Sequence, residues 1–403
     1  MFKEITIIGL GFMGASLAGA LKSKEPDIII NGFDISQKNI DFCLDNKFID
    51  KGIKINCEYC NNNSENKLAD NNSINFNTGI NINDDINRNI NILNKNINNF
   101  DLNYLPAGYN PLRSDIAILC VPPKVILKFL YDNKNFLAKF PLITDIGSIK
   151  KEIISASKKN NLKNFIGSHP MCGSDKSGAE NADTNMFQGK TCIVINKKCN
   201  DTTINSKDNL NNLNKTDCNC IDNSVNYEKI TSNNYSNDLT DSEKIASNDY
   251  DNNSVYAENI LSNNYYSGNS ESIEKISSFW KILGMEVIYA DADFHDYIVG
   301  YSSHLPHVVS FCLSKTVLDT ANANLPLNSL KYISSGFKDT TRIASSSENI
   351  WADIFLLNKS NLISSLDSYI DNINKFKVLL ENNDGDTLKI LIAEISKQRK
   401  MLG

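Results

Sequence analysis

The sequence is poor in histidine, since its 403 residues contain only four. All four lie in two short stretches, residues 168–173 and 295–307. Histidine is the side chain whose unperturbed pKa lies nearest neutral pH, so enzymes commonly use it to move a proton. Because so few histidines gather in two places, both stretches are predicted to belong to an active site.

Two further absences restrict the class of protein. The sequence has no run of the roughly 18 uncharged apolar residues that a membrane span needs. Residues 5–21 resemble a signal-peptide core, but their glycine spacing has a better explanation in nucleotide binding. The net charge of -6 and the lack of clustered Lys and Arg argue against nucleic-acid and anionic membrane partners, and leave a local basic pocket open.

The cysteine usage indicates a reducing environment. Ten cysteines in a chain of this length do not form a small secreted disulfide framework, so we expect a cytoplasmic protein. Four of them belong to sequence of strongly biased composition, with spacing that argues against a zinc site: Cys57, Cys60, Cys218 and Cys220. We therefore expect no bound metal.

Two blocks of the chain, about 56–111 and 199–270, are dominated by asparagine. Neither has a sustained helix or strand period, and such polar tracts bury too little apolar surface to offset the entropy of ordering. We predict two long disordered inserts. The second block holds three imperfect copies of one short segment, which we interpret as replication slippage rather than a solenoid: these copies begin at Glu228, Glu243 and Glu258.

Outside these blocks, short β-branched runs alternate with helical patterns as far as residue 290. This alternation predicts an α/β Rossmann-type domain, a doubly wound parallel sheet, over residues 1–290. The expected strands are 4–9, 28–34, 115–121, 142–146, 164–168, 191–195 and 285–289. The expected helices are 12–22, 36–46, 123–131, 148–160 and 271–283.

From Asp291 onward the strand signal ends and helical periodicity takes over. We expect a second, all-α domain over residues 291–403. Its predicted helices are 292–320, 325–335, 348–382 and 385–401.

The first strand leads into Gly9-x-Gly11-x-x-Gly14, and a predicted helix follows. This spacing allows a tight turn on which a dinucleotide pyrophosphate rests against the helix N-terminus, beside Phe12 and Met13. Asp34 ends the second strand, where a carboxylate binds the adenine ribose hydroxyls and repels a 2′-phosphate. NAD is therefore favoured over NADP. The alternative is a glycine-rich turn that binds nothing.

Two other strand ends are expected near the nicotinamide end of the cofactor, because ligands of open α/β sheets bind beyond the carboxyl ends of strands. One carries Val121 and Pro122, and the other carries Ser148. For the first, a simple strand stop before a helix explains the prolines equally well. For Ser148, capping the helix that starts at Ile149 is the rival role.

Four motifs follow one another along the chain: D-x-G-S-x-K at 145–150, H-P-M-x-G at 169–173, S-H-L-P-H at 303–307 and F-K-D-T-T-R-I-A at 337–344. In this order they closely resemble the prephenate/arogenate dehydrogenase family of tyrosine biosynthesis. The resemblance covers nearly everything outside the two asparagine-rich blocks. It departs from the family at Cys172, where a small alanine is common, and at Ser335, where a Gly-Gly pair is frequent.

The resemblance implies NAD-dependent oxidative decarboxylation of prephenate to 4-hydroxyphenylpyruvate. By motif position, His169 is the expected catalytic base on the ring hydroxyl, with Ser148 hydrogen-bonding the same region. Arg342 is the expected carboxylate clamp, since a guanidinium pairs bidentately with a carboxylate. His307 and His304 are the expected further substrate contacts.

The same resemblance assigns two more positions. Gly173 is expected to allow close approach of cofactor and substrate, and Trp351 to complete the pocket from a partner subunit. The helical domain is then expected to form a homodimer. Because the sequence ends soon after its last predicted helix, we expect any feedback by tyrosine to act at the active site.

Several positions keep a structural alternative. His304 and His307 also fit satisfied core histidines, and Arg342 fits a helix cap. His295, next to Asp296 at a helix start, is more typical of a structural or rim position.

Other functions remain in competition with prephenate dehydrogenase. Arogenate dehydrogenase shares the chemistry and takes an amine where prephenate has a keto group. Another Rossmann enzyme of the β-hydroxyacid dehydrogenase or imine reductase type would not need His169 and Arg342 in these motifs. A redox-sensing NAD-binding protein would bind the cofactor without turnover.

Overall fold

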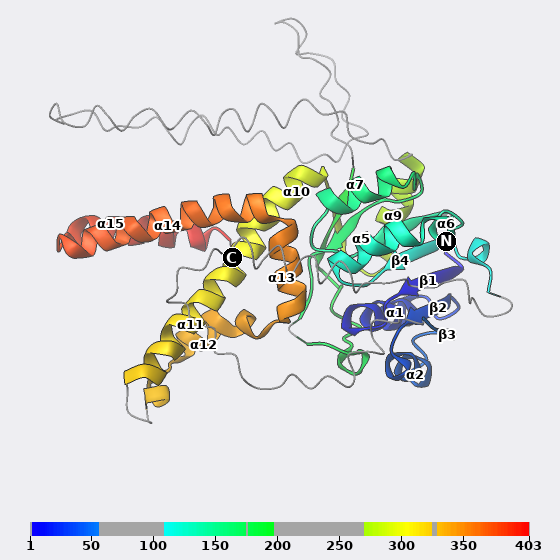
Figure 1. The fold of residues 1–403 in the computed structure, drawn as a ribbon, viewed down its shortest axis with the longest axis horizontal. Coiled ribbons are helices and arrows are strands. Elements are labelled where there is room, and N and C mark those ends of the chain that lie inside the picture. The colour runs from blue at the N-terminus through cyan, green and yellow to red at the C-terminus, as the bar shows by residue number, and fades with distance from the viewer. Residues whose placement is uncertain (1, 56–108, 175, 197–269, 325–328, 403) are drawn as a thin grey trace, which may run out of the picture.

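The computed structural model describes residues 2–55, 109–174, 176–196, 270–324 and 329–402. The two asparagine-rich blocks fall almost wholly outside these ranges, and so do the predictions made for them and for their cysteines. The described chain has an α/β part followed by a helical part, which lie side by side in Figure 1. This arrangement confirms the predicted fold class.

A parallel five-stranded sheet forms the centre of the α/β part, in the order β3-β2-β1-β4-β5. The predicted strands are present with slightly shorter bounds, and β3 was not predicted, because only Ile53 of its four residues is buried. The strands are β1 (Glu4–Ile8), β2 (Ile29–Asp34), β3 (Lys51–Lys54), β4 (Ile116–Leu119) and β5 (Ile143–Asp145).

Helices cover both faces of this sheet because the apolar side chains of each strand alternate between its faces. Ile5 and Ile7 of β1 pack into one core cluster with Trp280, and Ile8 packs into another with Phe129. The helices are α1 (Phe12–Lys24), α2 (Gln37–Asp45), α5 (Pro123–Asp132), α6 (Lys134–Leu137), α7 (Lys151–Lys159) and α9 (Ser270–Ile282).

A second sheet of three strands continues from the first. In it, β7 (Thr191–Ile195) pairs in parallel with β8 (Glu286–Ala290) and antiparallel with β6 (Ser168–Pro170). The predicted strand 164–168 is therefore shifted: Phe165 makes only an isolated bridge to Ile143, and regular pairing begins at Ser168. As a result His169 lies within a strand rather than after its end.

The first asparagine-rich block ends earlier than predicted. The Tyr109 hydroxyl lies 2.7 Å from Thr6 Oγ1, and the Tyr109 ring packs edge-on against Phe33 at 5.1 Å. Pro111 is buried at the start of a short 3-10 turn, η2 (Pro111–Arg113). These residues belong to the folded α/β part, so its chain resumes before residue 111.

The helical part begins with α10 (Ala292–Val299), which packs against α7 of the α/β part. The predicted helix 292–320 is interrupted by a π-helical turn, η5 (Gly300–His304), before α11 (Leu305–Asn324). π-Helical turns occur frequently at functional sites. The remaining elements are η6 (Ser329–Tyr332), α12 (Ser335–Thr341), η7 (Arg342–Ser345), α13 (Glu348–Leu357), α14 (Lys359–Glu381) and α15 (Gly385–Lys400).

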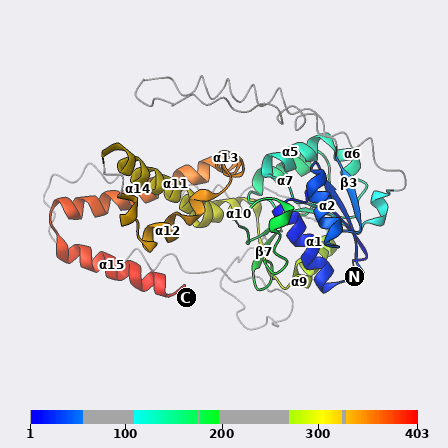
Figure 2. The ribbon, with the colours of Figure 1, turned by 90° about the horizontal axis from the view of Figure 1, so that it is seen from below.

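The last two helices pack against each other and extend away from the α/β part, as both views show (Figures 1 and 2). They expose a row of large apolar side chains: Ile363, Ile370, Ile373, Leu380, Ile390 and Ile392. Within the described ranges, no helix is both long enough and apolar enough to span a bilayer.

Candidate functional site

The glycine-rich loop joins β1 to α1, and its three glycines have different physical roles. Gly9 has a φ of +97°, and a Cβ there would lie 2.4 Å from the Cys120 carbonyl oxygen. A Cβ at Gly14 would lie 1.8 Å from the Gly9 oxygen. At Gly11 a Cβ would meet no protein atom within 4 Å. Packing therefore requires glycine at the first and third positions, whereas Gly11 borders open space.

This open space lies at the N-terminus of α1. Gly11 is the N-cap residue, no side chain caps the helix, and no acidic residue occupies its first turn. The first amide N–H groups are thus free to bind an anion. The Phe12 side chain is buried and Met13 is half-buried against the core, so these two residues offer their backbone amides rather than their side chains.

Asp34 connects the end of β2 to this loop. Its Oδ2 accepts a hydrogen bond from the Leu10 amide at 2.5 Å, and its Oδ1 accepts one from the Ser36 amide at 2.7 Å. Val121 also borders the loop, since its Cγ1 lies 2.7 Å from an ideal Cβ on Gly9. Pro122 is exposed directly before α5. The strand ends of β1, β2 and β4 therefore meet at one edge of the sheet.

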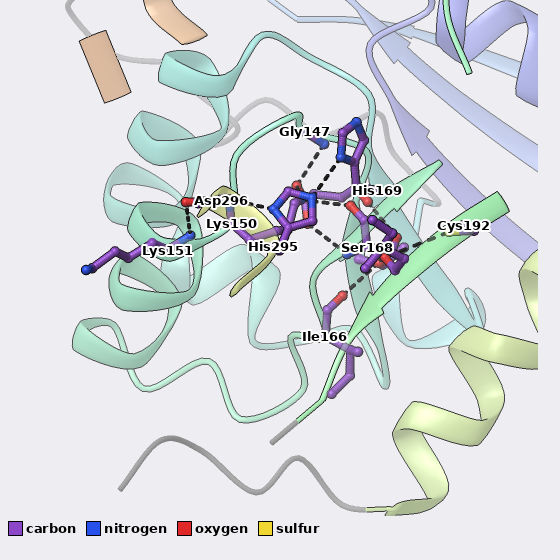
Figure 3. A network of polar contacts seen from close by, with 12 residues as sticks. Gly147, Lys150, Lys151, Ile166, Ser168, His169, Cys192, His295 and Asp296 are labelled. Atoms are coloured by element: carbon purple, nitrogen blue, oxygen red, sulfur yellow. Dashed lines mark hydrogen bonds and ion pairs between the residues drawn. The ribbon is translucent and has the colours of Figure 1, made fainter. Parts of the chain in front are cut away.

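His169 is the centre of a buried polar network (Figure 3). Its Nδ1 lies 2.8 Å from Nε2 of His295, whose Nδ1 lies 2.7 Å from Oδ1 of Asp296. The two imidazole rings meet edge-on, with centroids 5.1 Å apart. His169 comes from the α/β part and the other two residues from α10, so the network crosses the boundary between the two parts.

Asp296 also caps α7 from the helical part. Its two oxygens accept hydrogen bonds from the backbone amides of Lys150, at 2.7 Å, and Lys151, at 2.9 Å. Because α7 starts at Lys151, the rival role of Ser148 as a helix cap is wrong. Ser148 is half-buried, and its hydroxyl makes no hydrogen bond in the described part of the chain.

A buried ion pair fixes the backbone next to His169. Lys150 Nζ contacts Asp145 Oδ2 and donates a hydrogen bond to the Ser168 carbonyl at 2.8 Å. The Ser168 hydroxyl in turn accepts a hydrogen bond from Trp280 Nε1 at 3.0 Å. Both charged groups are fully buried, and burial raises the pKa of Asp145 and lowers the pKa of Lys150. Such a pair is costly to break, since one partner left alone is a buried uncompensated charge.

Burial controls protonation throughout this network. Loss of solvent, followed by repulsion from His295 and Lys150, lowers the pKa of His169 well below its usual value. Burial likewise lowers the pKa of His295, and it raises the pKa of Asp296 to about 6. His169 is therefore a neutral imidazole at pH 7, which is the protonation state that a general base needs.

His304 extends the network toward the helical part. Its Nδ1 accepts a hydrogen bond from Asn358 Nδ2 at 3.1 Å, and that amide also donates to the Asp296 carbonyl at 2.7 Å. Its other ring nitrogen, Nε2, is buried and has no partner among the described residues. Burial lowers the pKa of His304 to about 4. His304 thus presents an unpaired N–H close to His169 and His295.

His307 lies one helical turn further along the same segment. Its Nδ1 donates to the Ser303 carbonyl at 2.9 Å, and its ring stacks on Trp351 with centroids 3.4 Å apart. Burial, and after it the nearby Arg342 guanidinium, lowers the pKa of His307. Arg342 itself is exposed. His307, Arg342 and Trp351 thus form a second group.

One residue, His304, lies near both the His169 network and the group of His307, Arg342 and Trp351. The His304 ring lies 6.0 Å from the Trp351 ring and is near enough to His169 to lower its pKa. No hydrogen bond or ion pair joins His169 to Arg342. Trp351, expected from a partner subunit, stacks here on His307 of its own chain.

Gly173 follows His169 by four residues along the chain. It is exposed, and a Cβ on it would meet no atom of the described chain within 4 Å. Its neighbour Cys172 is half-buried, and burial raises the pKa of that thiol to about 12, so the thiol stays protonated.

Sequence reasoning missed His295, which was expected to be structural or at the rim. It is 1% exposed and makes the hydrogen bond that orients His169. The adjacent His-Asp pair was the available signal, but the partner of His295 lies 126 residues away along the chain and only the packing of α10 reveals it.

Comparisons with known proteins agree with this architecture, which is that of a nucleotide-binding oxidoreductase. The family model described as the prephenate dehydrogenase nucleotide-binding domain matches residues 108–230, and the one described as the prephenate dehydrogenase dimerization domain matches residues 291–394. The chain belongs to the prephenate/arogenate dehydrogenase family.

Individual relatives are distant in sequence. The cyclohexadienyl dehydrogenase of Zymomonas mobilis is 23% identical, over all of this chain and 97% of that enzyme. The prephenate dehydrogenase of A. aeolicus, solved with hydroxyphenyl propionate and NAD+, aligns with a TM-score of 0.63 at 22% identity, covering 100% of this chain and 99% of that one. The Synechocystis arogenate dehydrogenase aligns with a TM-score of 0.58 at 18% identity, covering 99% and 100%.

The buried neutral histidines predict that the fold loses stability in acid. A substitution of His304 measures the contribution of one histidine to this loss. Its pKa is 6.5 when unperturbed and about 4 in the folded protein, so between these values only the unfolded chain binds the proton. This lowers the free energy of unfolding by about 1.4 kcal/mol per pH unit from 6.5 down to about 4. We expect the free energy of unfolding of His304→Gln, measured in urea from neutral to acid pH, to fall less steeply by this amount. Equal slopes for the two proteins would contradict the assignment.

Proposed function

We propose that this protein is an NAD-dependent prephenate dehydrogenase that converts prephenate to 4-hydroxyphenylpyruvate and carbon dioxide. The observation that carries the proposal is the buried, neutral His169 in the network that joins the two parts of the chain. Membership of the family supplies the reaction class. When bound, NAD accepts the hydride from C4 of the substrate ring.

The glycine-rich loop fits a dinucleotide. Gly11 leaves the space in which a pyrophosphate approaches the free amides of α1, with the backbone of Phe12 and Met13 beside it. Asp34 lies at the end of β2, where its carboxylate would bind a ribose hydroxyl and repel a 2′-phosphate. Val121, Pro122 and Ser148 lie on the strand ends assigned to the nicotinamide end.

The remaining residues act on the substrate. His169 takes the proton of the ring hydroxyl, and Ser148 hydrogen-bonds the same oxygen through its free hydroxyl. Arg342 holds a carboxylate, and His307 and His304 contact the rest of the dianion. The unpaired N–H of His304 would donate a hydrogen bond to an acceptor atom of the ligand. Gly173 gives the reactants room, and Trp351 closes the pocket against His307.

The proposal includes the organisation of the chain. Residues 1–290 form the cofactor-binding domain, and residues 291–403 form the substrate and dimerisation domain. The exposed apolar side chains of α14 and α15 would be covered in a homodimer. The free thiols among the described cysteines fit the reducing cytoplasm expected from the sequence.

Arogenate is the second candidate substrate, since similar folds occur in an arogenate dehydrogenase and in a cyclohexadienyl dehydrogenase. Turnover of prephenate and of arogenate, each with NAD and with NADP, separates the alternatives. We expect the highest kcat/KM for prephenate with NAD. Higher kcat/KM for arogenate would move the assignment to that substrate, and no turnover of either would refute the proposed function.

Two variants test the assigned roles in the same assay. His169→Asn should lower kcat by about 10²–10⁴-fold, because it removes the base. Arg342→Ala should raise KM by about tenfold to a hundredfold, because it removes a charge-assisted contact. Lys375→Ala is the control, since it removes a positive charge from the exposed surface of α14. Its kinetics should equal those of the unmodified protein.

Gly11 tests the cofactor site separately from the fold. In Gly11→Ala the new methyl meets no protein atom, so the melting temperature should stay unchanged. The methyl does occupy the pyrophosphate space, so the Kd for NAD should rise by about tenfold or more. Gly385→Ala, which also adds a methyl in open space, is the matched control on α15. Unchanged NAD affinity in Gly11→Ala, measured by calorimetry, would place the cofactor elsewhere.

A further inference from the structure

We propose that His295 and Asp296 are positioning residues that hold the proton of His169 on Nδ1 and thereby leave Nε2 free to accept the substrate proton. The inference rests on the proposed function of His169 as the base. It adds a role for two residues of α10 that the motif-based assignment of the site leaves without one.

The hydrogen bonds determine where each proton lies. As a carboxylate, Asp296 only accepts, and it accepts from the Lys150 and Lys151 amides and from Nδ1 of His295. Nδ1 of His295 therefore carries a hydrogen, and Nε2 of this neutral ring carries a lone pair. That lone pair lies 2.8 Å from His169 Nδ1, which must therefore be the donor. The one proton of neutral His169 is then on Nδ1.

Reversing the hydrogen bond between Asp296 and His295 would also reverse the one between His295 and His169. If the Asp296 side chain donated to His295 Nδ1, then His295 Nε2 would carry the hydrogen and His169 Nδ1 would accept it. His169 would then hold its own proton on Nε2 and could not act as a base. The charge state of one carboxylate on α10 thus sets the chemistry of a ring on β6, through a shared hydrogen-bond chain.

Burial enforces this chain. His169 is 8% exposed, His295 is 1% exposed and Asp296 is 2% exposed, and buried polar atoms must pair. Lys150 contacts both ends of this hydrogen-bond chain, because its amide donates to Asp296 and its Nζ donates to the Ser168 carbonyl next to His169 (Figure 3). The two parts of the chain must be packed together before the base acquires its reactive tautomer.

The same chain stabilises the proton after transfer. The hydroxyl proton moves to His169 Nε2, and the imidazolium keeps its Nδ1–H bond to His295. The groups that face Asp296 are the Lys150 ammonium and the buried imidazoles of His295 and His304, and the ammonium favours the ionised carboxylate. Asp296 is thus kept as the acceptor on which the rest depends.

The test compares Asp296→Asn with Asp293→Asn. The second variant makes the same chemical change on the same helix, at a residue that pairs with Lys151 at 2.7 Å and does not touch the histidines. Oδ1 accepts from both His295 Nδ1 and the Lys150 amide, whereas Oδ2 accepts from the Lys151 amide. An asparagine at 296 therefore reverses the chain when its NH2 takes the Oδ1 position and keeps it when its NH2 takes the Oδ2 position, and proton NMR of His169 tells the two rotamers apart. In the reversed rotamer kcat should fall by about 10²–10⁴-fold with KM nearly unchanged. Asp293→Asn should keep kcat within about twofold. Equal kcat for both variants with His169 Nε2 protonated, or a large fall in kcat with His169 Nδ1 still protonated, would overturn the inference.

Two substitutions of His295 provide a second, independent comparison if Asp296→Asn does not fold. A glutamine at 295 offers an oxygen to His169 Nδ1–H, whereas a phenylalanine of similar volume offers no acceptor. His295→Gln should keep kcat at least about tenfold above His295→Phe, and only His295→Phe should shift the acid limb of the kcat–pH profile. A merely structural role predicts equal losses and unshifted profiles in both.

Proton NMR separates this inference from the proposed function, since it requires no substrate. A slowly exchanging Nδ1–H of His169 should be visible in the unmodified holoenzyme and in His295→Gln, and absent in His295→Phe. If that pattern appears while prephenate and arogenate are not turned over, the proposed function fails and the tautomer assignment stands. A protonated His169 Nε2 in the unmodified protein would overturn the assignment.

Discussion

The carboxylate of Asp296 is the contact on which the site depends. One side chain of α10 caps the first turn of α7, and one of its two oxygens, Oδ1, also accepts from His295 Nδ1. Capping a helix and directing an imidazole usually fall to different residues. Here they coincide at the boundary between the α/β part and the helical part, so the contact of the two parts and the proposed tautomer of His169 depend on one group.

This coincidence follows from the fold. A parallel sheet brings the carboxyl ends of its strands to one edge, where the glycine-rich loop, Asp34 and the Asp145–Ser148 segment meet. Such an edge supplies cofactor contacts, but it is open to solvent. The first helix of the second part, α10, packs against α7 and places His295 against His169, which is buried and neutral. Arg342 is exposed beside the half-buried His307, outside this buried zone.

The sequence predicted the features that depend on local pattern. The alternation of strands and helices gave the sheet, and the glycine spacing with Asp34 gave the loop. Features that depend on packing were missed or misplaced. Ser148 was an obvious cap candidate, but α7 begins after it and takes its cap from Asp296. His295 looked peripheral because nothing local indicates which distant side chain it meets. Trp351 stacks on His307 of the same chain, and its expected role in the pocket of a partner subunit stays a prediction.

A crystal structure of the protein with NAD and 4-hydroxyphenylpyruvate tests the central claim most directly. An imidazole from one part and a guanidinium from the other should hold the same ligand. The phenol oxygen should lie about 2.6–3.2 Å from His169 Nε2, with the ligand carboxylate on Arg342. A ligand that contacts only one of these residues, or a phenol oxygen that faces away from the imidazole, would contradict the account.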